Sequence, residues 1–351
     1  MHMVDLTQID VIAPNFKRRL SGVTSTVVRL VPLQAEDVAI TACAPVMPDH
    51  VPNIAWPRLL TMSRRGPHGA RVWHARRNVE MIAGLVLRAL GKDLKLVFTS
   101  ASQRKHTRLT RALIARMDAV IATSAKTAQY LERASTVIHH GIDTEVFCPA
   151  QNRDVARREL GLSPEGPLIG CLGRIRAQKG TDVFVDAMIG ATRTHPKAQA
   201  IVLGRALSKD QGFLADLKAR VAQAGLEHRI RFLDEVPVWD TPKYYQAMDL
   251  YIAPQRWEGF GLTPLEAMAC GAPVIATRVG AFEELVVEGE TGHLIAPGDV
   301  SAMTEAARAL LNAPGRLAEM SRAARKDMVA RFQLQQEADA ITQIYRKLLG
   351  A

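Results

Sequence analysis

The sequence predicts an α/β protein of two domains, each built on a parallel β-sheet covered by helices. Its 351 residues, 48% of them hydrophobic, exceed the size of one ordinary domain and can bury two cores. Short β-branched runs alternate with amphipathic helical stretches, as in parallel sheets covered by helices. This alternation occurs twice, before and after a stretch rich in proline and glycine at residues 149–167. We therefore predict two Rossmann-like domains with a boundary near residue 150.

The predicted strands are short apolar runs, five in each half of the chain. Those of the first half are 9–13, 38–43, 94–99, 119–122 and 137–138. Those of the second half are 168–172, 200–203, 230–233, 250–253 and 273–276. After residue 297 the periodicity is helical alone, which predicts three successive helices at 301–311, 316–331 and 334–349.

The segment 70–90 is predicted as one helix with an apolar stripe and four arginines, Arg71, Arg76, Arg77 and Arg88. Such a composition is compatible with an anionic membrane surface, but every helix of a doubly wound fold needs an apolar stripe to pack on its sheet. We therefore assign the stripe to packing and leave the role of the arginines open.

Positive charge is concentrated in the first half of the chain. The net charge is +10, and residues 1–150 hold 20 Lys and Arg against 11 Asp and Glu, whereas the remainder holds 25 against 24. This imbalance predicts an anionic partner for the first half: nucleic acid, a membrane surface or a phosphorylated glycolipid.

The four cysteines, Cys43, Cys148, Cys171 and Cys270, are widely separated. Their spacing favours neither a zinc site nor a redox dithiol, and we expect reduced thiols in a cytosolic protein. Asp5 and Asp10 lie where a signal peptide would be apolar, and Arg88 interrupts the most apolar run at 81–90. We therefore expect neither secretion nor a membrane span.

Two segments of the second half carry the chemistry. Residues 173–180, Gly-Arg-Ile-Arg-Ala-Gln-Lys-Gly, follow a predicted buried strand and precede a helix that starts near Thr181. Backbone amides and a helix N-terminus can bind an anion there, and Arg174 and Lys179 add full charges. Such a loop can neutralise a departing diphosphate without a metal ion. A glycine turn with solvated cations is the alternative, and neither a Walker nor a dinucleotide motif is present.

The second segment holds two glutamates, Glu258 and Glu266, eight residues apart around a glycine-rich turn. Pro264 suits a first helical turn, so Glu258 is predicted in a loop at the carboxyl end of a strand and Glu266 one turn into the next helix. Carboxylates suit hydroxyl-rich ligands, and the glycines permit close approach of the backbone. Either glutamate alone would be an ordinary surface acid; together they predict a sugar or ribose site.

These segments resemble the retaining glycosyltransferases of family 4, which have the GT-B fold. Glu258 and Glu266 match the family's E-x7-E motif, and Gly173 to Gly180 match its G-R-x4-K-G motif. Further matches lie at 267–274, 280–284, 289–292 and 141–149. The resemblance implies two Rossmann-like domains facing across a cleft: 1–150 for the acceptor, 151–333 for the nucleotide sugar, and a helix at 334–351 that packs back on the first.

The resemblance also implies residue roles. The first glutamate of the motif contacts the donor sugar, the second contacts the ribose, and the arginine and lysine contact the diphosphate. The implied catalytic residues are Arg174, Lys179 and Glu258. The implied donor site comprises Gly22, Gly173, Arg174, Lys179, Glu258, Gly259, Phe260, Gly261, Leu262 and Glu266.

The N-terminal half departs from the family pattern at two places. Where the family has paired glycines after the first strand, this chain has Ser21 and Gly22, and we assign only Gly22 to the donor site. Where many members have a histidine after the strand at 94–99, this chain has Ser102; His106 is the candidate substitute, against the alternative of an ordinary surface histidine. The basic residues Lys17, Arg18 and Arg19, with His106, are the candidate acceptor contacts.

The overall pattern is similar to bacterial lipopolysaccharide core mannosyltransferases. This similarity implies transfer of mannose from GDP-mannose, with retained configuration, to an anionic lipid-linked acceptor at the cytoplasmic face of the inner membrane. The nucleotide sugar is then a substrate, and neither a cofactor nor a metal is expected. The alternatives are a sugar-nucleotide epimerase of the same fold and a basic nucleic-acid-binding protein; no nucleic-acid-binding motif supports the latter, and we expect no nucleic-acid partner. A glycosidase also uses two carboxylates, but it needs no diphosphate loop, so it is the weaker interpretation of the two glutamates.

Overall fold

The computed structural model describes residues 4–17 and 22–350. It divides into two compact units, one of residues 1–141 with 334–351 and the other of residues 142–333. The divide lies at Gly141, nine residues before the boundary expected near 150. The reason is that Ile142 already belongs to the second unit: its amide donates to the Phe332 carbonyl (2.8 Å), and Ile142 forms a parallel bridge with Gln333.

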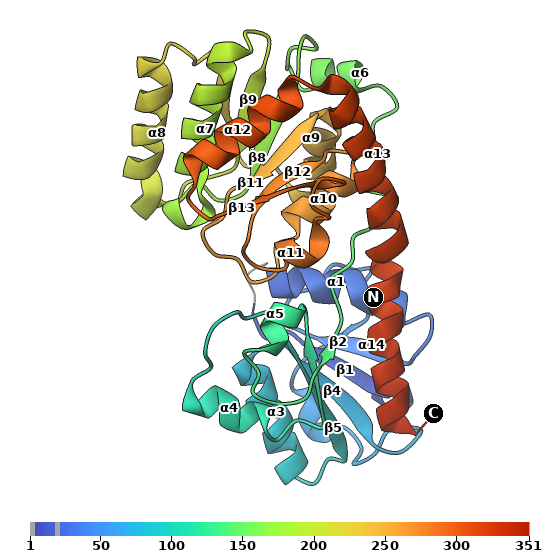
Figure 1. Cartoon of the computed structure of the whole chain (residues 1–351). Coiled ribbons are helices and arrows are strands. Elements are labelled where there is room, and N and C mark those ends of the chain that lie inside the picture. The colour runs from blue at the N-terminus through green and yellow to red at the C-terminus, as the bar shows by residue number, and fades with distance from the viewer. Residues whose placement is uncertain (1–3, 18–21, 351) are drawn as a thin grey trace. The chain divides into compact units, whose positions relative to one another are not determined.

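The first unit contains a parallel sheet, ordered β3-β2-β1-β4-β5-β6-β7 among the described residues (Figure 1). Its strands are β1 Val11–Pro14, β2 Ile40–Cys43, β3 Asn53–Ile54, β4 Arg71–Ala75, β5 Leu94–Ser100, β6 Ala119–Ala122 and β7 Thr136–Val137. The five strands predicted here are present, with ends shifted by one or two residues for most. The sequence pattern missed β3 and β4.

The prediction of one helix over 70–90 was wrong. Residues Arg71–Ala75 form β4, which pairs with β1 and β5 and is buried throughout, and α3 starts only at Asn78. Trp73 lies fully buried in this strand and donates its indole N–H to the Glu80 carbonyl (2.8 Å). A short apolar run followed by a helix gives the same local pattern as one longer helix, so only the sheet distinguishes them.

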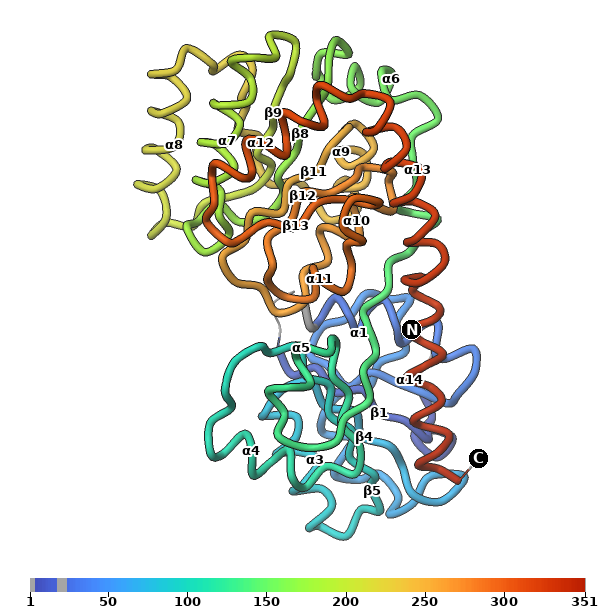
Figure 2. Tube along the Cα trace, viewed as in Figure 1, coloured from blue at the N-terminus to red at the C-terminus, as the bar shows by residue number. Residues whose placement is uncertain are grey.

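Helices cover both faces of this sheet. They are α1 Gly22–Gln34, α2 Arg58–Thr61, α3 Asn78–Ala89, α4 Arg108–Ile114, α5 Ala125–Ala128 and α14 Leu334–Leu349. Side chains of α1 and α14 share one apolar core with β1, β2 and β5. Helices α3 and α4 lie beside each other (Figure 2), and their side chains share a second core with β4, β5 and β6.

The last helix, α14, is tied to the first unit by buried polar contacts. The Tyr345 hydroxyl lies 2.5 Å from Nδ1 of His74, whose Nε2 lies 2.7 Å from the Thr99 hydroxyl. Burial, and then the charge of Arg76, lowers the pKa of His74 well below its ordinary value, so this imidazole is neutral. Glu337 accepts from the Gly141 amide (2.8 Å) and faces His140 (2.7 Å). Sequence-distant residues thus fix α14 in place.

The second unit contains another parallel sheet, ordered β10-β9-β8-β11-β12-β13 among the described residues. Its strands are β8 Leu168–Leu172, β9 Gln199–Leu203, β10 Ile230–Leu233, β11 Leu250–Ala253, β12 Val274–Thr277 and β13 Gly292–Ile295. The predicted bounds of β8, β10 and β11 are confirmed as they stood. The edge strand β13 was missed because half of its residues are only partly buried.

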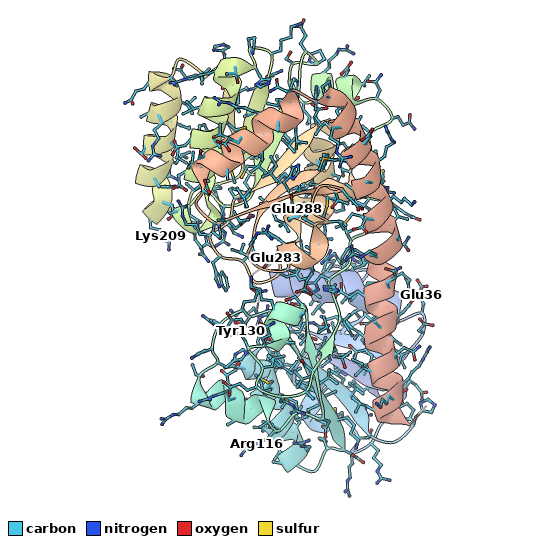
Figure 3. The ribbon with its side chains drawn as sticks, in the orientation of Figure 1. Glu36, Arg116, Tyr130, Lys209, Glu283 and Glu288 are labelled. Atoms are coloured by element: carbon cyan, nitrogen blue, oxygen red, sulfur yellow. The ribbon has the colours of Figure 1, made fainter. Side chains whose placement is uncertain are left out.

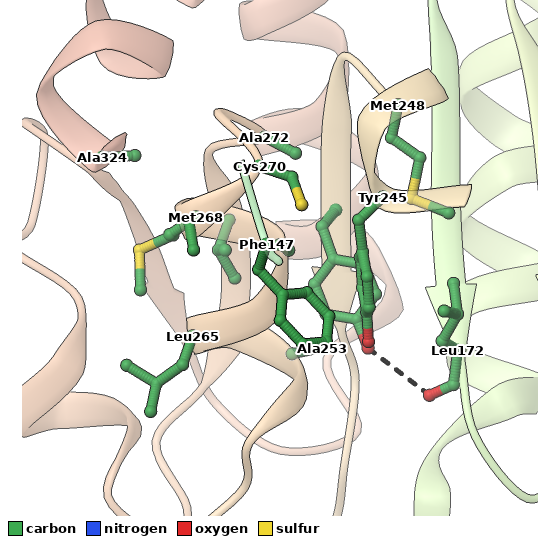
Figure 4. Packing of buried hydrophobic residues seen from close by; sticks show 14 of the residues in the cluster. Phe147, Leu172, Tyr245, Met248, Ala253, Leu265, Met268, Cys270, Ala272 and Ala324 are labelled. Carbon is green, nitrogen blue, oxygen red and sulfur yellow. Dashed lines mark hydrogen bonds between the residues drawn. The ribbon is translucent and has the colours of Figure 1, made fainter. Parts of the chain in front are cut away.

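Two apolar cores lie on the two faces of this second sheet. One contains side chains of α9 Thr241–Ala247, α10 Thr263–Ala269, α11 Phe282–Leu285 and α13 Pro314–Arg331; the other contains those of α7 Thr181–Thr194, α8 Gln211–Gln223 and α12 Val300–Leu311. The short helix α6 Arg153–Glu159 precedes the sheet. Figure 4 shows the first core around Phe147 and Tyr245, where the Tyr251 hydroxyl donates a hydrogen bond to the Leu172 carbonyl (3.4 Å).

Charged side chains cover the outside of both units (Figure 3). On the second unit, for example, Nη1 of Arg278 lies 3.7 Å from the Glu283 carboxylate, and its Nη2 lies 4.0 Å from that of Glu288. The four cysteines are free thiols. Among the helices formed by residues 4–17 and 22–350, none has both the length and the apolar character needed to cross a bilayer.

Candidate active site

The two predicted motifs meet at the carboxyl ends of β8 and β11. These strands are neighbours, although the chain passes through β9 and β10 between them. The order of the strands therefore reverses between β8 and β11, and ligands of open α/β sheets bind at such a point. The loop at 173–180 follows β8 and the loop at 254–262 follows β11, so the fold brings them to one edge of the sheet.

The loop after β8 turns sharply into α7. Gly173 has φ +135° and Gly180 has φ +69°, backbone conformations that favour glycine. A side chain at Gly180 would also collide with the carbonyl of Pro254 in the neighbouring loop. Helix α7 starts at Thr181, as the sequence predicted. The loop amides and the N-terminus of α7 thus lie at the same edge of the sheet as the second motif.

Arg256 fastens the two loops together, and sequence reasoning missed it. Its guanidinium donates two hydrogen bonds to the Asp182 carboxylate (2.7 and 2.8 Å) and one to the Ala177 carbonyl (2.6 Å). Its backbone amide donates to the Gln178 carbonyl (3.0 Å). Burial alone would raise the pKa of Asp182, but the hydrogen bonds and charge of Arg256 hold it below its ordinary value. Arg256 therefore positions the loop that carries Lys179.

Lys179 and Glu258, one from each motif, form an ion pair. Their side chains are 25% and 19% exposed, so the pair is half-buried and reachable from solvent. The other oxygen of Glu258 accepts from the Gly259 amide (3.0 Å). Although Lys179 and Glu258 are 79 residues apart in the sequence, they lie close enough to contact the same ligand.

Arg174, unlike Lys179, is exposed and unpaired among the described residues. Within that set, no hydrogen bond or ion pair engages its guanidinium. Arg176, two residues on, is half-buried and its Nε has no partner in that same set. The loop therefore presents the exposed cation of Arg174 beside Lys179, which pairs with Glu258, and both are next to the start of α7.

Glu266 lies in the first turn of α10, where Pro264 occupies one of the first two helical positions. Its carboxylate accepts a hydrogen bond from the Tyr245 hydroxyl (2.7 Å). Burial, and then the charge of Glu266, raises the pKa of Tyr245 well above its ordinary value, so this hydroxyl stays protonated and donates. Tyr245 is a second residue that the sequence did not reveal, because α9 carries no motif.

The turn between the glutamates is fixed by packing. Phe260 is buried, and its carbonyl accepts from the Ala281 amide (3.0 Å). Gly261 has φ +93°, and a side chain there would collide with the ring of Phe282. Gly259 and Leu262 are half-buried beside it. The glycine at 261 is therefore required by the backbone and by Phe282, before any ligand is considered.

The remaining candidates lie in the first unit, at the carboxyl-end edge of its sheet. Lys17 follows β1 and is exposed, and Gly22 begins α1. His106 follows β5; burial, and then Arg104, lowers its pKa, and its Nε2 is buried with no partner among the described residues. Arg18 and Arg19 lie outside the described residues, as does Ser21.

A polar network at this edge was not predicted. Asn15, which follows β1, is fully buried and accepts from Nη1 of Arg77 (2.6 Å) and from the Thr24 hydroxyl (3.1 Å). Arg77 also pairs with the buried carboxylate of Glu80 (2.7 Å). Of the four arginines left open above, Arg77 thus has a structural role that ties the loop after β1 to α1 and α3, the helices that flank it.

The fold is that of a GT-B glycosyltransferase: two parallel-sheet α/β units, with the cationic loop at 173–180 and the paired glutamates at the switch point of the second unit. The model of the group 1 glycosyl transferases matches residues 152–327, half of the chain. The chain belongs to this family.

Two relatives match along the full chain. The lipopolysaccharide core biosynthesis mannosyltransferase LpsB of Rhizobium meliloti (strain 1021) is 51% identical, over 99% of this chain and 100% of the relative. The corresponding mannosyltransferase LpcC of Rhizobium leguminosarum bv. viciae is 46% identical, over 99% of each. Among solved structures, Anabaena Alr3699/HepE in complex with UDP superposes with a TM-score of 0.84 at 20% identity, over 97% of this chain and 100% of that one. The resemblance found in the sequence is thereby confirmed.

Proposed function

We propose that this glycosyltransferase transfers mannose from GDP-mannose, with retained anomeric configuration, to the lipopolysaccharide core. The names of the two full-length relatives support the sugar and the pathway. The observation that carries the proposal is the Lys179–Glu258 ion pair, which joins the diphosphate motif to the sugar motif at the switch point of the sheet.

In this proposal the second unit binds the donor. Arg174, Lys179 and the amides at the start of α7 bind the diphosphate, because they supply the positive charge at that edge. Glu258 accepts hydrogen bonds from the hydroxyls of the donor sugar, and Glu266, oriented by Tyr245, accepts those of the ribose. Gly173 and Gly259–Leu262 let the backbone approach the ligand closely, and Gly22 of the first unit contacts the donor phosphates.

The proposed reaction breaks the bond between the anomeric carbon and the diphosphate oxygen. The acceptor hydroxyl attacks that carbon from the same face and loses its proton to the departing diphosphate, so the configuration is retained and GDP leaves. Arg174 and Lys179 stabilise the charge that develops on the leaving oxygen. In this mechanism Arg174, Lys179 and Glu258 are the catalytic residues.

The acceptor is proposed to bind the first unit. Lys17, Arg18, Arg19 and His106 are the candidate contacts, and an anionic, lipid-linked sugar accounts for the excess of positive charge in residues 1–150. Such an acceptor places the enzyme at the cytoplasmic face of the inner membrane.

The test is to incubate the protein with GDP-mannose and a mannose-deficient lipopolysaccharide core, and to determine the anomeric configuration of the product by NMR. We expect an α-mannoside, and GDP that appears only when acceptor is present. Transfer from UDP- or ADP-sugars at equal efficiency would contradict the donor assignment, and a β-mannoside would contradict retention. Release of GDP and an altered sugar without acceptor would instead indicate the epimerase.

Because two protein cations are proposed to neutralise the diphosphate, turnover is expected to persist in excess EDTA. The measurement is the initial rate of GDP release before and after EDTA treatment, with Mg²⁺ or Mn²⁺ added back to a parallel sample. A rate that EDTA abolishes and a metal ion restores would show that Arg174 and Lys179 do not suffice for the leaving group.

A further inference from the structure

Helix α3 is apolar on two faces. Its inner face packs on the sheet through Met81 and Leu87, both buried. Its outer face carries an exposed stripe at intervals of three, four and four residues: Val79, Ile82, Val86 and Leu90, which are 52%, 41%, 51% and 63% exposed. Residues at this spacing share one side of a helix. A surface helix of a soluble domain needs only one apolar side, so the second calls for a partner.

The neighbouring helix α2 extends this apolar surface. Trp56 and Leu60 are 60% and 57% exposed. With Val86 and Leu87 of α3, and with Phe16 after β1, they line an open pocket of about 490 Å³ whose lining residues are all apolar. We call the stripe, Trp56, Leu60 and this pocket the α2–α3 face. Figure 1 shows α3 beside α4, on the side of the sheet away from α1 and α14.

The segment that carries the α2–α3 face is strongly basic. Residues 54–95 hold nine Lys and Arg against two acids, whereas the rest of residues 1–150 holds 11 against nine. Arg71 and Arg76 are buried, and Arg77 pairs with Glu80. The cations of this segment that remain at least partly exposed are Arg58, Arg64, Arg65, Arg88, Lys92 and Lys95. Two of them are paired, Arg65 with Asp93 (3.1 Å) and Arg88 with Asp118 (3.2 Å), and for the other four no carboxylate partner is found among the described residues.

One of these cations is held directly beside the apolar surface. Lys92, just after α3, donates from Nζ to the Leu60 carbonyl (3.2 Å) and to the Met62 carbonyl (2.5 Å) at the end of α2. Neither contact neutralises its charge, because both acceptors are carbonyls. Most of the positive excess that the sequence analysis found in residues 1–150 thus belongs to the segment that forms α2, α3 and their flanks.

We propose that the α2–α3 face docks on the surface of an anionic lipid bilayer. Trp56, Leu60, Val86 and Leu90 enter the boundary between headgroups and acyl chains, while the surrounding cations bind the lipid phosphates. A second copy of the chain would bring two such positive segments together and repel itself. Docking of this face deepens the proposed function and rests on it, because the lipid-linked acceptor is what gives the docking its purpose. The docking itself can be measured without donor, acceptor or turnover.

The first experiment is co-sedimentation with vesicles of phosphatidylcholine, alone or mixed with phosphatidylglycerol. The wild-type protein is expected to bind the mixed vesicles and to be released by salt. The double variant Trp56→Ser/Leu60→Ser should bind them at least about tenfold more weakly, since it loses the apolar contribution. Arg64→Gln and Lys92→Gln should each weaken binding about fivefold, as expected for one basic residue near an anionic surface.

The matched control lies on the second unit. Val238 and Trp239 are 66% and 74% exposed, more than Trp56, yet they lie outside the α2–α3 face. Val238→Ser/Trp239→Ser should therefore leave vesicle binding unchanged. A second double variant, Val86→Ser/Leu90→Ser on α3, guards against a local effect at α2 and should weaken binding as Trp56→Ser/Leu60→Ser does.

A second experiment tests whether Trp56 enters the lipid. Vesicles of brominated lipid should quench part of the tryptophan emission of the wild-type protein. The Trp56→Phe variant should lose that quenched part, whereas Trp239→Phe should keep it. The proposal would be overturned if Trp56→Ser/Leu60→Ser and Val86→Ser/Leu90→Ser bound vesicles as well as the wild type, or if Trp56→Phe retained the quenching. A wild-type dimer in solution that Trp56→Ser/Leu60→Ser converts to a monomer would overturn it as well.

Measurements of mannose transfer distinguish a failure of the docking proposal from a failure of the proposed function. With an acceptor from which the acyl chains have been removed, Trp56→Ser/Leu60→Ser should transfer mannose as fast as the wild type, since these residues are not part of the proposed active site. With the intact acceptor in vesicles it should be slower. A wild-type protein that binds vesicles but transfers no mannose would contradict the proposed function and leave docking supported.

Discussion

Replacing Arg174 or Lys179 by alanine is expected to lower kcat by about 10²- to 10³-fold, the usual cost of removing one group that stabilises transition-state charge. In the proposed reaction, the charge on the leaving diphosphate is largest in the transition state. Each cation therefore contributes more to the transition state than to the bound donor, and kcat should fall by more than KM for GDP-mannose rises.

The measurement is kcat and KM for GDP-mannose at saturating acceptor. Arg193→Ala is the matched control, because Arg193 is exposed on the same helix, in the last turn of α7, roughly 20 Å from the loop. It should leave both constants unchanged. A normal kcat with a raised KM in Arg174→Ala or Lys179→Ala would show that the cations bind the donor without acting on the leaving group.

The two alanine variants should also differ from each other. Arg174 has no partner in the described structure, so Arg174→Ala removes only the interaction of this guanidinium with the donor. Lys179 pairs with Glu258, and Lys179→Ala leaves that carboxylate uncompensated where the diphosphate must bind. Lys179→Ala should therefore raise the donor KM more than Arg174→Ala does, and combining it with Glu258→Ala should not add the two losses.

Part of the second unit could be predicted from the sequence, because β8 and β11 are buried throughout and are followed directly by Gly173 and Pro254. The apolar runs of β8 and β11 gave correct bounds, and glycines at 173 and 180 marked the turn into α7. Parallel strands place their carboxyl ends at one edge of a sheet, so two motifs that follow neighbouring strands meet there. The Lys179–Glu258 contact is an instance of this rule.

What could not be predicted depends on contacts between distant residues. Arg256 is one cation among many until the fold brings it to Asp182 and Ala177, and Tyr245 stands out only once its hydroxyl reaches Glu266. The strand β4 was taken for helix because its burial depends on β1 and β5 at its two sides. The charge count predicted that the first half is positive, but not which surface carries the accessible charge. That surface depends on the burial of Arg71 and Arg76, and its apolar part on the exposure of Trp56.

Replacing Glu258 by alanine is expected to separate binding of the nucleotide from transfer of the sugar. In the proposal Glu258 accepts hydrogen bonds from the donor sugar, and a hydrogen bond to a charged group contributes about 1.5 to 3 kcal/mol. The kcat/KM for GDP-mannose should therefore fall roughly 10- to 150-fold. Glu258→Gln, which keeps a carbonyl acceptor without the charge, should lose less.

Binding of GDP alone should respond in the opposite direction. GDP has no sugar for Glu258 to contact, and the carboxylate competes with the diphosphate for Lys179 in the unliganded protein. Its removal should leave the Kd for GDP unchanged or lower it, which calorimetry can measure beside kcat/KM. Glu283→Ala, a variant of an exposed glutamate on α11 that lies 3.7 Å from Arg278, is the control and should alter neither quantity. If GDP affinity and kcat/KM fall together in Glu258→Ala, then Glu258 serves the nucleotide or the fold of its loop, and its assignment to the donor sugar is wrong.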